Sequence, residues 1–137
     1  AQRQTYAKRR GIQMIALYIA LGGAMGALAR FGVHQWMLAS GVGAFGASTL
    51  TVNVIGSFAI GCCFIVFERL NVSEAVRLGL MVGFLGAFTT FSTFSLELLT
   101  ELQAGNYLRP GIYAVSSVLL CLFGCYVGFT LARAIID

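Results

Sequence analysis

The run Gly83-Phe-Leu-Gly-Ala-Phe-Thr-Thr-Phe-Ser-Thr-Phe-Ser95 decides how the rest of the chain is interpreted. It lies in the third of four long apolar tracts, and its glycines, Gly83 and Gly86, weaken helical structure near the middle of that tract. Five hydroxyl groups follow, on Thr89, Thr90, Ser92, Thr93 and Ser95. Because a bilayer core holds no water to satisfy polar groups, the cluster favours a third helix that is broken near its middle and faces protein, water or an ion.

The composition indicates an all-α integral membrane protein. Of the 137 residues, 58% are hydrophobic and 10% are charged, and the mean hydropathy is +0.86. Charged residues make up about a quarter of an ordinary soluble domain. Four uncharged tracts are long enough to cross a bilayer, at residues 12–29, 48–67, 78–96 and 111–132. The short connections leave no room for a soluble catalytic domain, so we expect no enzymatic activity. One copy of four short helices encloses little space, which predicts an oligomer.

The basic residues fit the flanks of membrane spans. The net charge is +4, and no basic face that would bind nucleic acid remains once the spans are removed. Residues 1–13 form a basic N-terminal extension, which we interpret as a cytoplasmic segment or as non-native residues. Met14 is then a plausible natural start, and residues 14–137 form a single four-helix transmembrane domain.

The extension controls the predicted orientation. With four spans, both termini and the second loop share one side of the membrane, and the Lys and Arg residues divide into Arg3, Lys8, Arg9, Arg10, Arg69, Arg77 and Arg133 against Arg30 and Arg109. Without residues 1–13, three basic residues face two and the orientation is nearly unspecified. Such a chain can insert in both orientations and pair antiparallel, as an inverted repeat made of two copies.

The first span carries small residues and one arginine at helical spacing. Gly22, Gly26 and Arg30 are four residues apart, so they lie on one face. The glycines favour close helix packing. Two interpretations of Arg30 remain open: its guanidinium either extends to the membrane interface or collects anions at a vestibule.

A polar stripe runs along the second span, where Thr49, Asn53 and Ser57 are also four residues apart. Hydrogen bonds between helices explain hydroxyl groups well. Asn53 is harder to explain in this way, because an unpaired carboxamide in hydrocarbon costs several kcal/mol. We therefore favour a functional role for Asn53.

The last two spans carry further polar and aromatic candidates. Phe91 and Phe94 are three residues apart, so both rings project from one face, and aromatic edges carry partial positive charge that stabilises an anion. Glu97 is either interfacial or functional. A stripe in the fourth span consists of Tyr113, Ser117, Cys121 and Cys125. The cysteines predict neither disulfides nor a metal site, since buried thiols in apolar helices are usually small hydrophobes.

Two weaker signals lie near the first loop. Residues 41–46 match G-x-G-x-x-G, but no strand precedes them and no βαβ unit surrounds them, so we interpret the match as accidental. His34 and Trp36 fit an interfacial belt better than a metal site.

Three of these motifs resemble the Fluc/CrcB family of fluoride channels. They are Gly22-Gly-Ala-Met-Gly-Ala-Leu-Ala-Arg30, Thr49-Leu-Thr-Val-Asn53 followed by Gly56, and above all Gly83-Phe-Leu-Gly-Ala-Phe-Thr-Thr-Phe-Ser-Thr-Phe-Ser-Leu-Glu97. The resemblance covers the chain from Met14 onward. Two positions depart from the common pattern, where Ala87 replaces a glycine and Cys121 replaces a serine.

The resemblance implies an antiparallel dual-topology homodimer with two fluoride pores. By motif, Phe91 and Phe94 would be the pore phenylalanines and Asn53 the pore asparagine. Membership would also imply a central Na⁺ bound by backbone carbonyls, and further roles at or near the pore. These positions are Thr93 and Ser117 in a polar track, Tyr113 approaching the pore, Arg30 at the vestibule, and Gly86 and Thr89 at the Na⁺.

The function implied is passive export of cytoplasmic fluoride across a bacterial inner membrane. The alternative is a small proton-coupled multidrug exporter, which is also a four-helix dual-topology dimer. That class needs a carboxylate within the membrane, and Glu97 is the candidate in the third span.

Overall fold

The structure is a computed structural model that describes residues 2–136, except for the side chains of residues 3–5, 7 and 8. Over this range the chain is helical and contains no strand. The elements are α1 (Gln2–Ala39), α2 (Ala47–Arg69), α3 (Glu74–Leu78), the π-helical segment η1 (Gly79–Leu85), α4 (Gly86–Phe88), α5 (Phe91–Gln103) and α6 (Leu108–Ile136).

Within residues 2–136, four helical stretches are long and apolar enough to cross a membrane, which confirms the predicted all-α class and the four spans. They are Arg9–Ala39, Ala47–Arg69, Glu74–Gln103 and Leu108–Ile136. Each is longer than the uncharged tract that predicted it, because helical hydrogen bonding continues into the polar flanks. The elements α3, η1, α4 and α5 together make up the third span.

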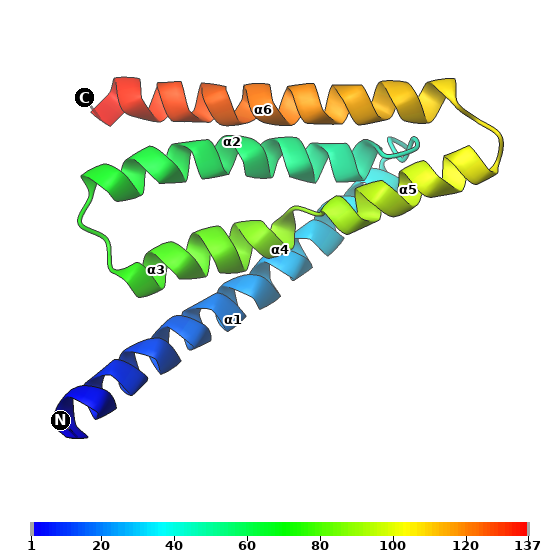
Figure 1. Cartoon of the computed structure of the whole chain (residues 1–137). Helices are drawn as coiled ribbons and strands as arrows, with labels where there is room; N and C mark the ends of the chain where they lie inside the picture. The colour runs from blue at the N-terminus through cyan, green and yellow to red at the C-terminus, as the bar shows by residue number, and fades with distance from the viewer. Residues whose placement is uncertain (1, 137) are drawn as a thin grey trace.

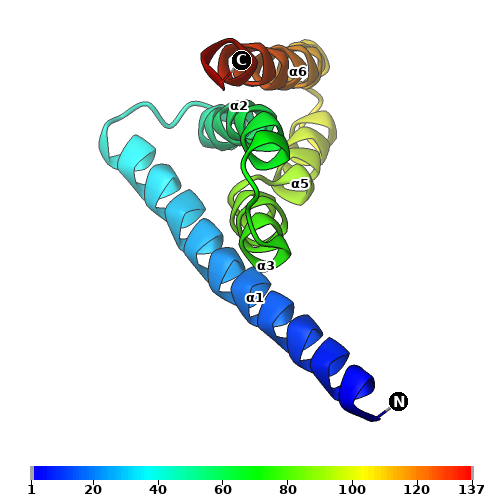
Figure 2. The same cartoon turned by 90° about the vertical axis from the view of Figure 1, so that its left-hand side faces the viewer.

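The spans alternate in direction, and both ends of the described chain lie on the same side of the molecule (Figure 1). Helix α2 packs along α6, and α1 packs against η1 and α4. Helix α1 crosses the others diagonally, and a second view shows it on the side of α3 away from α6 (Figure 2). The molecule therefore consists of two helix pairs, with the third span between α1 and α2.

Glycines allow the helices of each pair to approach closely. In the first pair, a Cβ at Gly22 would overlap the carbonyl oxygen of Gly79, and one at Gly26 would overlap the carbonyl oxygen of Phe84. In the second pair, a Cβ at Gly128 would overlap the carbonyl oxygen of Phe58. Gly22 and Gly26 thus form a packing face, as their four-residue spacing predicts.

Large apolar side chains cover the outside of all four spans. Leu28, Phe64, Leu96 and Phe123 are each more than half exposed. In water so much exposed apolar surface would drive association, whereas a bilayer solvates it. The polar side chains described next lie instead where the spans meet.

Candidate functional site

The third span is interrupted at two threonines. Helix α4 ends at Phe88 and α5 begins at Phe91, and the residues between them are extended: Thr89 has φ −84° and ψ 160°, and Thr90 has φ −153° and ψ 119°. The glycines to which the sequence analysis assigned the weakness are helical, with Gly86 at φ −62° and ψ −36°. The interruption lies at β-branched residues, which adopt extended conformations readily.

Asn53 holds the interruption in place from α2. Its Nδ2 donates a hydrogen bond to the Thr90 carbonyl at 3.0 Å, and its Oδ1 accepts one from the Thr90 N–H at 2.7 Å. Helix α2 approaches closely enough because Gly56 lies against Thr89, where a Cβ would overlap the threonine methyl group. The carboxamide that seemed hard to satisfy in an apolar helix is therefore paired with backbone.

Thr90 also caps the helix that follows. Its Oγ1 accepts a hydrogen bond from the Thr93 N–H at 3.2 Å and donates one to Thr93 Oγ1 at 3.0 Å. An N-cap hydroxyl satisfies one of the four free N–H groups at the start of a helix. From the sequence, Thr90 was one hydroxyl of a cluster, and the signal for its capping role is that threonine is a preferred N-cap residue.

One cavity of about 340 Å³, here called the break cavity, lies beside the interruption. Its lining residues, all within the described chain, carry no charge; they are Asn53, Gly56, Ser57, Ile60, Met81, Leu85, Gly86, Thr89, Thr90, Phe91, Phe94, Ser117, Val118 and Cys121. The Oγ of Ser117 is buried and has no hydrogen-bond partner in the described part of the chain. A buried hydroxyl without a partner is unfavourable, so Ser117 is suited to a ligand that enters this cavity.

The two candidate phenylalanines lie against the break cavity with different exposure. Phe94 is buried, whereas Phe91 is 76% exposed. Their ring centroids are 5.4 Å apart, and the Phe94 ring also packs 5.2 Å from the ring of Tyr113. The aromatic pair therefore has one ring that packs against α6 and one ring that the described residues leave mostly exposed.

A second cavity, here called the arginine cavity, lies on the other side of the interruption and has a volume of about 310 Å³. It is lined by Ala27, Arg30, Phe31, His34, Ser48, Thr49, Val52, Thr90 and Thr93. The Arg30 guanidinium points toward the interruption and donates to the Thr89 carbonyl at 3.5 Å. His34 Nδ1 lies 2.9 Å from Ser48 Oγ at the same cavity. Arg30 therefore points toward the interior of the protein, and its role at an anion vestibule stays a prediction.

The residues of the predicted polar track and of the polar stripe in the second span are divided between the two cavities. Asn53, Ser57 and Ser117 line the break cavity, whereas Thr49 and Thr93 line the arginine cavity. Thr90 lines both. The interruption therefore forms the wall between the two cavities.

Glu97 connects α2, α5 and α6. Its Oε1 accepts a hydrogen bond from Thr49 Oγ1 at 2.7 Å, and its Oε2 accepts one from the Tyr113 hydroxyl at 2.8 Å. Each carboxylate oxygen thus has a partner from a different helix. Thr49 and Tyr113 therefore bind the Glu97 carboxylate, which their spacing in the sequence did not indicate.

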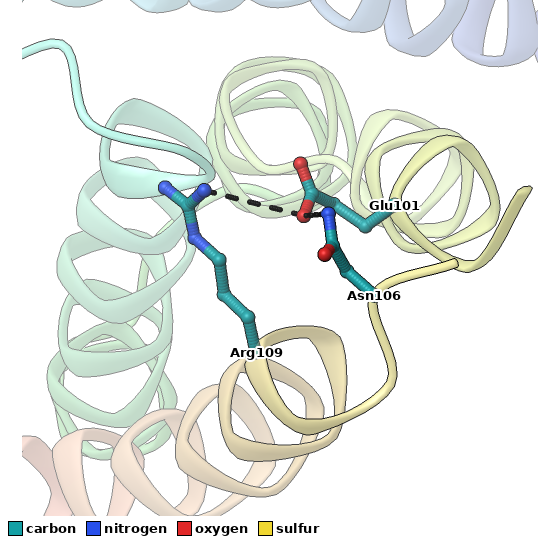
Figure 3. A network of polar contacts seen from close by, with 3 residues as sticks. All are labelled: Glu101, Asn106 and Arg109. Atoms are coloured by element: carbon teal, nitrogen blue, oxygen red, sulfur yellow. Dashed lines mark hydrogen bonds and ion pairs between the residues drawn. The ribbon is translucent and has the colours of Figure 1, made fainter. Parts of the chain in front are cut away.

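A further polar group lies one helical turn outward from Glu97. Glu101 Oε2 accepts a hydrogen bond from Asn106 Nδ2 at 3.0 Å and lies 4.0 Å from an Arg109 guanidinium nitrogen (Figure 3). The Arg109 guanidinium also covers the ring of Phe45 at 4.8 Å, and that ring meets Tyr113 edge-on at 5.1 Å. This group was not predicted from the sequence, although the four-residue steps from Glu97 to Glu101 and from Arg109 to Tyr113 were signals for it.

Four apolar spans, one of them interrupted beside two cavities, define a small multi-pass membrane protein with a few buried polar groups between its helices. The model of the CrcB family, described as "CrcB-like protein, Camphor Resistance (CrcB)", matches residues 17–129. The chain belongs to this family, as its motifs predicted.

Several relatives resemble the chain over most of its length. A protein of Hahella chejuensis named fluoride-specific ion channel FluC is 44% identical over 121 residues, which are 88% of this chain and 95% of the relative. A protein of the same name from Magnetococcus marinus is 46% identical over 119 residues, 86% of this chain and 97% of the relative. A third, from Idiomarina loihiensis, is 44% identical over 113 residues, 82% of this chain and 88% of the relative.

Proposed function

We propose that this protein is a fluoride-selective channel that exports cytoplasmic fluoride passively across a bacterial inner membrane. The observation that carries the proposal is the buried, unpaired hydroxyl of Ser117 beside Phe91 and Phe94, in an uncharged cavity of a CrcB-family chain. The relatives named as fluoride-specific ion channels support the identity of the ion.

The break cavity offers the groups that a small, strongly hydrated anion needs when it loses water. Ser117 presents a hydroxyl, and Asn53 keeps one N–H that is not committed to Thr90. The rings of Phe91 and Phe94 add positively polarised edges. Larger halides are excluded in a bore too narrow for them.

Transport in this proposal is passive and needs no coupled source of energy. Fluoride enters cells as its uncharged acid in acidic surroundings and ionises in the near-neutral cytoplasm, where it is trapped. A channel lets the inside-negative potential drive the anion out, with about 2.3 kcal/mol per charge per 100 mV.

The proposed assembly is an antiparallel homodimer. Phe91 is 76% exposed although it lines the break cavity, so a second copy of the chain is the element that would cover it. The weak charge bias of residues 14–137 supports insertion in both orientations.

A sodium ion at the subunit interface completes the proposal. The backbone carbonyls of Gly86 and Thr89, one pair from each subunit, would bind it, and the ion would hold the two interrupted spans together. The Thr89 carbonyl supports this role, because it already accepts a hydrogen bond from a cationic group, Arg30.

The exporter alternative finds no support. No relative cited above carries the name of a multidrug transporter. Glu97, its candidate carboxylate, accepts hydrogen bonds from Thr49 and Tyr113, which tie it to helix packing.

Fluoride efflux from liposomes tests the proposal. The purified protein should release fluoride rapidly without a proton gradient and retain chloride. Ser117→Ala should slow fluoride efflux about tenfold, the effect of about 1.4 kcal/mol. Because the hydroxyl has no hydrogen-bond partner among the described residues, its removal should leave folding intact.

The matched control is Ser116→Ala, which removes a neighbouring hydroxyl that does not line the break cavity. Its efflux should equal that of the wild type. Equal efflux from the wild type and Ser117→Ala would remove Ser117 from the path, and efflux of cationic dyes driven by protons would favour the exporter.

A further inference from the structure

The hydrogen bonds at the interruption leave the Gly86 and Thr89 carbonyls without the backbone N–H donors that a continuous α-helix would give them. In a continuous α-helix, each N–H donates to the carbonyl four residues earlier, so the Thr90 N–H would donate to Gly86 and the Thr93 N–H to Thr89. Here the Thr90 N–H donates to Asn53 Oδ1 at 2.7 Å, and the Thr93 N–H donates to Thr90 Oγ1 at 3.2 Å. Asn53 Oδ1 and Thr90 Oγ1 thus accept the hydrogen bonds that the Gly86 and Thr89 carbonyls would accept in a continuous helix.

We infer that Asn53 and Thr90 are positioning residues that build a cation site, Asn53 by freeing the Gly86 carbonyl and Thr90 by freeing the Thr89 carbonyl. The inference rests on the proposed sodium ion and says how the chain makes room for it. It gives Asn53 a task separate from contact with fluoride.

The chemistry of the freed carbonyls favours a cation. A carbonyl that has lost its helical N–H donor is unfavourable in apolar surroundings, and a positively charged group, as Arg30 is at Thr89, offsets that cost. Both carbonyls lie where α4 ends, and the C-terminal end of a helix carries partial negative charge. The Thr89 carbonyl accepts the Arg30 guanidinium at 3.5 Å, which shows that positive charge can reach it.

Asn53 is bound at both ends of its carboxamide, so its removal has a defined consequence. Its Nδ2 holds the Thr90 carbonyl while its Oδ1 holds the Thr90 N–H, and together they keep Thr90 in an extended conformation. Without these two bonds, the Thr90 N–H is free to donate to the Gly86 carbonyl. The interruption then shortens, and the Gly86 carbonyl is no longer available to a cation.

The first experiment measures the sodium dependence of dimer melting for the purified full-length protein, in sodium chloride and in N-methylglucamine chloride. The wild type should melt at a higher temperature in sodium. Asn53→Leu, which is similar in volume but cannot accept the Thr90 N–H, should lose that difference. Thr51→Val is the control, because the Thr51 hydroxyl bonds only to its own helix at the Ala47 carbonyl and should keep the sodium dependence.

The second experiment addresses the other carbonyl and decides the matter if Asn53→Leu does not fold. Thr90→Ala removes the oxygen that accepts the Thr93 N–H, whereas Thr90→Ser keeps it. The sodium concentration that gives half of the stabilisation should rise about tenfold in Thr90→Ala. It should remain near the wild-type value in Thr90→Ser.

The outcomes separate this inference from the proposals beneath it. Unchanged sodium dependence in Asn53→Leu and Thr90→Ala, with a sodium-stabilised wild type, would overturn the inference alone. A wild type that melts alike in both salts would overturn the sodium site and the inference together. Fluoride efflux from the same preparation would leave the channel function standing in either case.

Discussion

Thr90 performs three tasks within one residue. Its backbone is held at both ends by Asn53, its hydroxyl caps α5, and its side chain lines both cavities. Residues with so many contacts lie where a helix is forced to stop, because the freed backbone groups need new partners there. At this scale the interruption depends on a few side-chain oxygens rather than on flexible glycines.

Exchange of Phe91, the exposed phenylalanine proposed for the pore, should reduce transport and leave stability nearly unchanged. Phe91→Ile removes a ring edge, and ring-edge interactions are worth up to about 1.5 kcal/mol, so fluoride efflux should fall about tenfold. Phe91 is 76% exposed in the single chain, so little packing is lost. The control is Phe123→Ile on the outer face of α6, where Phe123 is 66% exposed. Efflux reduced equally in both variants would argue against a specific role for Phe91.

Loss of one hydrogen bond to Glu97 should weaken the contact between α5 and α6. Tyr113→Phe removes the hydroxyl that donates to Glu97 Oε2 at 2.8 Å and keeps the buried ring. The free energy of unfolding in a detergent titration should fall by about 1 kcal/mol, the usual size for a hydrogen bond between membrane helices. Tyr126→Phe on the same helix, where Tyr126 is 67% exposed, should show no loss.

Among the elements, the third span differs from the other three in how it is held. Its first half packs against α1 through glycines, and its second half is connected to α2 and α6 through hydrogen bonds of Asn53 and Glu97. The π-helical segment η1 lies in the glycine-packed half, and π-helical turns occur frequently at functional sites. A change in the first half should therefore affect packing against α1, and a change in the second half should affect the hydrogen bonds to α2 and α6.

Glycine substitutions in α1 should separate packing from helix propensity. Gly26→Ala places a Cβ against the carbonyl of Phe84 and should destabilise the protein, because α1 must move away from the third span. Gly32→Ala is the matched control, since no heavy atom lies within 4 Å of its added Cβ. It should be neutral or stabilising by about 1 kcal/mol, the difference in helix propensity. Thermal melting of both variants checks the prediction, and equal melting temperatures would contradict it.

The number of spans and their small-residue faces could be predicted because both depend on local composition and on four-residue spacing. The place of the interruption could not, because Gly83 and Gly86 remain helical within a span that packs against α1. The extended residues are fixed by Asn53, which lies 37 positions before Thr90 in the sequence. A pairing between residues so far apart depends on how α2 meets the third span, which no local pattern contains.

The same reason explains the part of the site that was missed. The sequence identified Glu97, Thr49 and Tyr113 as separate candidates, but their mutual hydrogen bonds depend on the packing of three elements. Phe45 lies in the glycine-rich loop to which no function was assigned. Its ring contacts the Arg109 guanidinium, and this contact depends on how the loop is placed relative to α6.

For the whole molecule, the charges at the two ends of the spans bear on orientation. Both ends of the described chain lie on one side, with Arg69 and Arg77 near the loop between α2 and α3, whereas Arg109 lies at the opposite side (Figure 1). Residues 1–13 are predicted to add positive charge to the side of the chain ends. Orientation in the membrane should therefore depend on these residues.

Cysteine labelling from both faces of the membrane checks this dependence. Asn71→Cys, in a chain that begins at Met14 and has its four native cysteines replaced, should react with an impermeant maleimide from either side. Roughly half of the copies should react from each side if the charge bias is as weak as the sequence indicates. Adding residues 1–13 should shift labelling toward the cytoplasmic side. Labelling of the Met14 chain from one side only would contradict dual insertion.

The two glycine-packed pairs meet along a seam that is joined by polar bonds, those of Asn53 to Thr90 and of Glu97 to Thr49 and Tyr113. The proposed ion path follows this seam. The same few polar residues therefore hold the two halves together and lie where groups must replace the water of the ion. A substitution that changes conduction at this seam therefore also changes the stability of the contact between the two helix pairs. Ser117 is the exception, because its buried hydroxyl makes no hydrogen bond within the geometric limits to any described residue, so a substitution there should alter passage of the ion with little effect on the contact between the two halves.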